Sequence, residues 1–158
     1  MDTNLTVVNV LIVASVFAPL FILINIGNKN KRKISKQFKS LAHKYMLNIT
    51  NQEYWGNALI GIDVNKQKLL FLRLENDSFT EYQIDLTKVV VCKINATYKS
   101  KKTKQKKENI LEKVDLQLYF PGHTSNLISL NFYDHNRLFN ENLEVMRAEK
   151  WKGLIMKQ

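Results

Sequence analysis

The sequence contains little cysteine, glycine or proline, and each shortage excludes a class of protein. One cysteine, five glycines and two prolines occur among its 158 residues. A single cysteine excludes an internal disulfide framework and a metal site built from several cysteines. Five glycines leave little for phosphate-binding loops, and no Gly-x-Gly-x-x-Gly, Walker-type or His-Glu-x-x-His motif is present. An apolar fraction of 45% excludes a disordered chain, and the length allows one compact domain with an appendage.

Residues with the chemistry of catalysis are few and scattered. His43, His123 and His135 show no metal-ligand spacing with Cys92. No serine or cysteine belongs to a nucleophile motif, and Cys92 lies in an apolar stretch where we expect an inert thiol. We therefore expect no catalytic residue, no metal site, no cofactor and no small-molecule substrate, and we predict that the protein is not an enzyme.

The longest apolar stretch runs from Leu5 to Ile26 and contains 22 residues and no charge. As a helix it would be about 33 Å long, which is enough to cross a hydrocarbon core of about 30 Å. A cleaved signal peptide is the alternative, but residues 1–4 carry Asp2 and no basic side chain. The pattern predicts a single transmembrane anchor over residues 1–27, with its span at about 5–26.

The next segment, residues 28–45, is basic. It holds no acidic residue and seven basic ones, namely Lys29, Lys31, Arg32, Lys33, Lys36, Lys39 and Lys44. Positive flanks stay on the cytoplasmic side, so we expect a single-pass protein of the cell (inner or cytoplasmic) membrane, with its N-terminus outside and its C-terminal domain in the cytosol. The segment also predicts a basic amphipathic juxtamembrane helix with Ile34, Phe38 and Leu41 on its apolar face. That face either lies on the membrane interface or packs on the folded domain, and the sequence leaves both open.

From about Met46 onward the apolar period changes from 3.6 to 2, which is typical of β-strands. We expect a β domain over residues 46–158 that ends in a helix at 135–157. Its seven strands are expected at 46–51, 58–63, 68–74, 79–85, 89–97, 110–119 and 126–133.

The order of elements is seven short strands followed by one C-terminal helix that carries Trp151. This order resembles the pleckstrin-homology-like (PH-like) domains, in particular the membrane-anchored bacterial ones. The resemblance implies an α+β, mainly β fold, in which a seven-stranded antiparallel barrel or sandwich is capped by the C-terminal helix and Trp151 has a structural role. It also implies a binding scaffold and not a catalyst.

One connection departs from the PH-like pattern. Members of the family that bind phosphoinositides carry basic residues around the first hairpin, whereas residues 51–57 contain no lysine or arginine. Recognition of inositol phosphates by that route is therefore not expected. Tyr54 and Trp55 are instead a candidate aromatic contact, or alternatively a hydrophobic plug at one end of the barrel.

A second basic cluster lies between the fifth and sixth expected strands. Its residues are Lys99, Lys101, Lys102, Lys104, Lys106 and Lys107. The stretch 99–107 has no apolar residue, so we expect a mobile loop that is either solvated or in contact with an anionic partner. Together the two clusters hold 13 of the 24 basic residues, so the positive charge is concentrated.

These observations support three functional hypotheses. The leading one is a single-pass membrane protein that presents a cytosolic PH-like binding module, whose ligand is a protein partner or the membrane surface. The alternative is an anionic-lipid sensor in which the seven basic residues of 28–45, together with Lys101, Lys102, Lys104, Lys106 and Lys107, contact lipid headgroups. Nucleic-acid binding ranks last among the binding functions, because neither lysine cluster has the aromatic interleaving expected of a base-stacking platform.

Overall fold

The computed structural model describes residues 3–103, 106–122, 126–135 and 143–157. Within these ranges, side chains are not described for residues 3–12, 16, 20–28, 101–103 and 106–108. The element order is one long helix, seven strands with a 3₁₀ turn among them, and a second helix.

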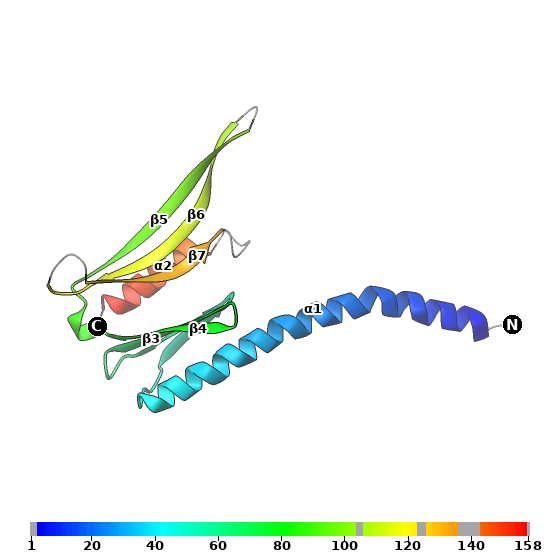
Figure 1. Ribbon diagram of the computed structural model, residues 1–158, viewed down its shortest axis with the longest axis horizontal. Coiled ribbons are helices and arrows are strands. Elements are labelled where there is room, and N and C mark those ends of the chain that lie inside the picture. The colour runs from blue at the N-terminus through cyan, green and yellow to red at the C-terminus, as the bar shows by residue number, and fades with distance from the viewer. Residues whose placement is uncertain (1–2, 104–105, 123–125, 136–142, 158) are drawn as a thin grey trace.

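The first helix, α1 (Thr3–Lys44), is continuous over 42 residues. Its C-terminal part lies along the first sheet, and its N-terminal part projects away from the rest of the molecule (Figure 1). The helix ends where Met46 adopts a positive φ of 52°. Residues 45–50 then lead the chain back to the sheet.

The first sheet is an antiparallel meander in the order β1-β2-β3-β4. Its strands are β1 (Asn51–Trp55), β2 (Ala58–Asp63), β3 (Lys68–Glu75) and β4 (Ser78–Asp85). All six residues of β2 are buried because both faces of this strand are covered. The 3₁₀ turn η1 (Leu86–Lys88) then carries the chain to the second sheet.

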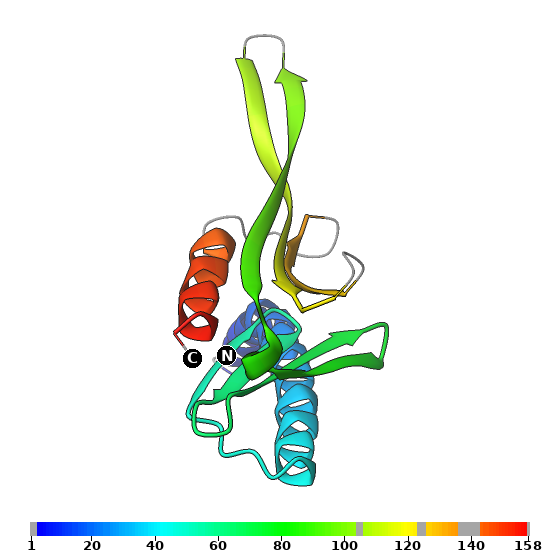
Figure 2. The ribbon, with the colours of Figure 1, turned by 90° about the vertical axis from the view of Figure 1, so that its left-hand side faces the viewer.

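The second sheet has the order β5-β6-β7 and contains β5 (Val91–Thr103), β6 (Lys106–Tyr119) and β7 (Leu127–Asp134). Strand β7 pairs with β6 only from Lys113 to Tyr119. Residues 98–103 and 106–111 therefore form a two-stranded ribbon without a third strand, which we call the arm. The arm rises above the rest of the molecule in Figure 2.

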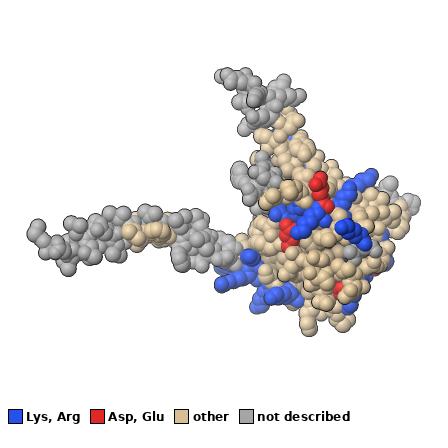
Figure 3. Space-filling view, turned by 180° about the vertical axis from the view of Figure 1, so that it is seen from behind, with Lys and Arg blue, Asp and Glu red and all other residues tan. Residues whose placement is uncertain are grey.

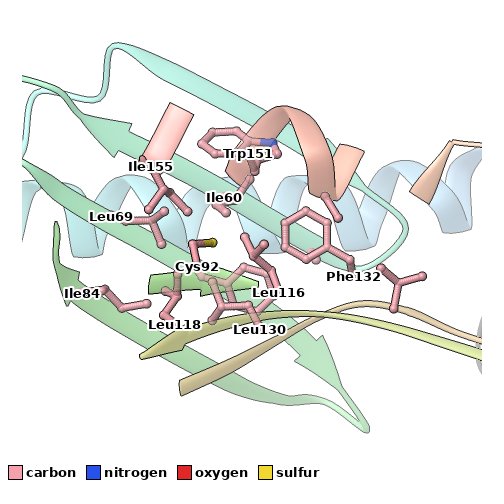
Figure 4. Close-up of a cluster of buried hydrophobic side chains, with 14 of the residues drawn as sticks. Ile60, Leu69, Ile84, Cys92, Leu116, Leu118, Leu130, Phe132, Trp151 and Ile155 are labelled. Atoms are coloured by element: carbon pink, nitrogen blue, oxygen red, sulfur yellow. The ribbon is translucent and has the colours of Figure 1, made fainter. Parts of the chain in front are cut away.

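The main core lies between the two sheets and is closed by helix α2 (Glu144–Ile155). Figure 4 shows Trp151 and Ile155 of α2 beside Cys92, Ile60 and Leu69. A second cluster lies on the other face of the first sheet, where Ile34 and Phe38 of α1 pack on its strands. The first sheet is thus the middle layer of three.

The expected strand positions are confirmed for six of the seven strands, and the range 58–63 agrees at both ends, whereas the other five differ at one or both ends. The first one is wrong: residues 46–50 are turn and coil, and 51–55, expected in a connection, form β1. In the basic segment expected as a loop, residues 99–103 and 106–107 are strand, because β5 continues to Thr103 and β6 begins at Lys106, while 104 and 105 lie outside the described residues. The C-terminal helix begins at Glu144 and not at residue 135, and 136–142 lie outside the described residues.

The expected fold class, a transmembrane helix followed by a PH-like seven-stranded barrel or sandwich, is contradicted, and no closed barrel is present in the described part of the chain. The strands form two separate antiparallel sheets of four and three strands, and none of the described residues pairs one sheet with the other. The physical reason is that side chains fill the space between the sheets: Trp151 and Ile155 of α2 enter it, and η1 takes the chain across without a strand pairing.

The expected transmembrane anchor is also contradicted. No helix in the described part of the chain combines the length and the apolar character that a bilayer crossing requires. The stretch of α1 whose side chains are described without a gap, residues 29–44, is amphipathic, and its apolar face covers the first sheet. The single-pass location, the outside N-terminus and the cytosolic domain inferred from that anchor are corrected accordingly.

Candidate functional site

The apolar face of α1 is packed on the domain, which decides between the two alternatives left open by the sequence. Ile34, Phe38 and Leu41 are buried against the leucines at positions 59, 70, 72 and 74 of β2 and β3. The approach is close because Gly61 has no side chain: a Cβ there would come within 2.8 Å of the Phe38 ring. The residues on the opposite side of the helix therefore face outward.

Four residues form a line along that outward side, which we call the basic stripe: Arg32, Lys36, Lys39 and His43. Their spacing of four, three and four residues places them on one side of a helix, about 16 Å from end to end. All four are exposed. Figure 3 shows Lys and Arg side chains in blue gathered where α1 joins the rest of the molecule.

The cations that flank the stripe have partners within the domain. Lys33 forms an ion pair with Asp77 at 2.8 Å, and this hydrogen bond, with the charge of Lys33 and of nearby Lys29, lowers the pKa of Asp77. The ammonium of Lys31 lies 5.5 Å from the ring centroid of Tyr54, and that of Lys44 lies 5.3 Å from the ring of Tyr45. By contrast, no ion pair with a described acidic residue involves Arg32, Lys36 or Lys39.

The second basic cluster lies elsewhere in the molecule. The backbone places Lys101, Lys102, Lys106 and Lys107 at the end of the arm. In the register of β5 and β6, Lys101 lies opposite Glu108 and Lys102 lies opposite Lys107. Lys104 lies outside the described residues. Figures 1 and 2 both show the arm pointing away from the C-terminal part of α1, so the outward side of α1 and the end of the arm are separate surfaces.

The aromatic residues singled out in the sequence serve packing. Trp55 is buried between the sheets, stacks on Phe132 with 4.8 Å between ring centroids, and donates a hydrogen bond from its Nε1 to the Phe132 carbonyl oxygen. Tyr54 is half-buried on the opposite face, in the cluster with α1. Trp151 is buried and donates its Nε1 hydrogen to Glu53 at 2.9 Å. Trp55 therefore lies in the core and not at the surface.

Two polar networks were not expected from the sequence, because their members are far apart in the chain. Glu53 accepts hydrogen bonds from Arg147, Lys150 and Trp151 of α2. Burial alone would raise the pKa of Glu53, but these three donors outweigh it and hold the pKa below its usual value. In the second network, Arg73 of β3 donates to Asn131 of β7 across the space between the sheets. The first network joins β1 to α2, and the second joins the two sheets.

Groups suited to catalysis are not gathered in the described part of the chain. No three His, Cys, Asp or Glu residues among the described side chains are placed to hold a metal ion. Cys92 is buried in the main core, where desolvation raises the pKa of its thiol to about 11 despite the nearby charge of Lys152. This thiol is therefore protonated at neutral pH and is a poor nucleophile. The basic stripe is the most distinctive candidate surface that remains.

Comparison of the chain with protein-family models, with curated proteins and with solved structures found no match, so its resemblance to PH-like domains stays a prediction.

Proposed function

We propose that this small, mainly β domain is a binding module that docks on an anionic lipid surface through the basic stripe of α1. The observation that carries the proposal is the orientation of α1. Its apolar face is buried on the first sheet, while Arg32, Lys36 and Lys39 face outward without an ion pair to a described acid. A row of cations that the domain itself does not neutralise favours an external anionic partner.

A lipid surface fits the stripe better than a nucleic acid does. Clusters of Lys and Arg on an amphipathic helix are typical of segments that bind anionic lipids. The stripe contains no Phe, Tyr or Trp of the kind on which successive bases stack in single-stranded nucleic-acid sites. The proposal includes no catalytic step.

The test is partitioning of the full chain onto vesicles, with Arg32→Gln/Lys36→Gln as the variant. Each cation near an anionic leaflet contributes about 1 kcal/mol, so the loss of two is expected to weaken partitioning about 30-fold. The quantity to measure is the ratio of partitioning onto vesicles containing phosphatidylglycerol to that onto pure phosphatidylcholine vesicles. This ratio cancels contributions that do not depend on lipid charge. The effect should shrink as salt screens the charges.

The matched control is Lys88→Gln/Lys157→Gln, which also removes two exposed cations but from η1 and the C-terminal end. We expect this control to keep a ratio close to that of the parent chain. Equal ratios for the stripe variant and the control would contradict the proposal, since only the total charge would then matter. A ratio near one for the parent chain would contradict it as well.

A further inference from the structure

A groove of about 300 Å³ opens between the C-terminal end of α1 and the first sheet. This volume is at the lower end of the range for small-molecule sites. Its floor is apolar and consists of Phe38, Ala42, Leu47 and Ile49.

Three exposed polar side chains, which we call the rim, line the groove. They are the side chains of Lys39 and His43 from α1 and of Gln52 from β1, and all three are exposed. None of the described residues that line the groove is acidic. An ammonium, an imidazole and a carboxamide all supply N–H donors, which a carboxylate accepts, and the ammonium also supplies the opposite charge.

Hydrogen bonds hold the chain that forms the wall of the groove. After α1 ends, the Leu47 amide donates to the Ala42 carbonyl oxygen at 2.8 Å, which turns the chain under the helix. The Asn48 amide donates to the buried carboxylate of Asp63 at 2.7 Å, and the Thr50 hydroxyl donates to the Ile62 carbonyl oxygen at 3.0 Å. The groove is therefore a built feature of the fold, and a ligand finds it already formed.

We propose that this groove binds a single-chain carboxylate amphiphile, with its alkyl chain on the apolar floor and its carboxylate between Lys39 and His43. An apolar floor beside the basic side chains of Lys39 and His43 matches a ligand that has one apolar part and one anionic end. A peptide would need partners for its backbone amides and carbonyls along its length, and only three of the described lining residues have polar side chains. The inference does not rest on the proposed function, because the ligand binds as a free molecule without a vesicle.

The experiment titrates the full chain with dodecanoate and follows the methyl signals of Ala42, Leu47 and Ile49 by NMR. Dodecanol supplies the same chain without the charge, and acetate supplies the carboxylate without the chain. We expect dodecanoate to shift these three signals, dodecanol to bind about tenfold more weakly, and acetate to shift none. Equal affinities for dodecanoate and dodecanol, or shifts that leave these signals unchanged, would overturn the proposal. So would binding of an N-acetylated Leu-Leu-Asp peptide in place of dodecanoate, which would assign the groove to a protein segment.

Two variants locate the site. Ala42→Phe fills the floor and is expected to abolish the dodecanoate-induced shifts at Leu47 and Ile49. This change touches a packed position, so the second variant is Gln52→Glu at the exposed rim. It places a negative charge beside the carboxylate of the ligand and should weaken the binding of dodecanoate about tenfold while leaving the core unchanged. Lys88→Gln, distant on η1, should bind dodecanoate as the parent does. Unchanged affinity in both groove variants would overturn the proposal, whatever the vesicle experiment shows.

Discussion

At the scale of single residues, Glu53 joins the first sheet to α2. Its carboxylate forms ion pairs with Arg147 and Lys150 at 2.9 Å each, and it accepts a hydrogen bond from the Trp151 indole N–H. Glu53→Gln keeps an oxygen for Trp151 but removes the charge that balances the largely buried Arg147. We expect the free energy of unfolding to fall by about 1.5–3 kcal/mol, the range for hydrogen bonds to charged groups. Urea unfolding at neutral pH measures this loss.

The pH dependence of the same residue provides an independent test. Because the pKa of Glu53 is lowered in the folded state, its stabilising contribution is complete above the unfolded pKa of about 4.3 and is lost as the pH falls through the folded pKa. The stability difference between the parent chain and Glu53→Gln should therefore narrow below about pH 4. Glu81→Gln, a change at an exposed carboxylate of β4, is the control. A difference that stays constant down to low pH would show that the ion pairs contribute nothing.

At the scale of elements, the arm differs from the rest of its sheet. Residues 98–103 and 106–111 have one partner strand each, whereas β6 from Lys113 to Tyr119 lies between β5 and β7. Two-stranded ribbons are marginally stable in water. We therefore predict that the amides of Tyr98, Ser100 and Ile110 exchange hydrogen at least tenfold faster than those of Leu116 and Leu118, as measured by NMR. Equal protection would mean that contacts other than the two-stranded ladder hold the arm.

The elements also show what local sequence can and cannot predict. The expected range of β2, 58–63, agrees with the structure because a short apolar run between turns marks a strand buried on both faces. Strand β1 was missed because it is an edge strand whose first residues are exposed and polar, so no alternation appears. Met46, Leu47 and Ile49 suggested a strand, but two of them face α1 in the second cluster. Whether such a segment forms a strand or a turn depends on which distant segment packs on its apolar residues.

The candidate site shows the same division. All the cations of α1 could be named from the sequence, and so could the apolar face opposite them. The partners of two of those cations, however, lie far along the chain. Asp77 in the β3–β4 turn forms an ion pair with Lys33, and the ring of Tyr54 in β1 lies beside the Lys31 ammonium. The groove beside Lys39 also requires β1, which the sequence pattern did not indicate.

At the scale of the whole molecule, the distribution of the acidic residues explains why the surface is so basic. Asp63, Asp115 and Glu144 are buried, and Glu53 is largely so. Asp63 accepts a hydrogen bond from the Lys66 amide in a turn, Asp115 forms an ion pair with Lys113 of the same strand, and Glu144 accepts a hydrogen bond from the Leu143 amide at the start of α2. The lysines and arginines of α1, by contrast, lie on the outside of the domain. The formal net charge of +10 is thus unevenly distributed, which favours a surface that acts as an anion-binding face.

The two sheets are themselves tied by a polar contact that a substitution can test. The guanidinium of Arg73 donates to the Asn131 side chain at 2.7 Å and to its backbone oxygen at 2.6 Å, and the Asn131 amide donates to Asp115 at 2.9 Å. Arg73 and Asp115 are both at least 95% buried, with relative exposures of 5% and 4%. Asn131 therefore mediates between two buried opposite charges on different sheets.

Asn131→Ala removes this mediator, and Arg73 keeps the backbone oxygen of residue 131 and its ion pair with Glu75 at 3.7 Å. We expect the free energy of unfolding to fall by about 2–3 kcal/mol, because a buried charged group that loses a hydrogen-bond partner loses more than a neutral one does. Chemical unfolding followed by tryptophan fluorescence measures the loss, since Trp55 and Trp151 lie in the core between the sheets. Asn109→Ala, at an exposed position of the arm, should change stability by less than about 0.5 kcal/mol. If the two variants were equally stable, packing of the apolar core alone would hold the two sheets together, and the polar contact would serve only to set their relative position.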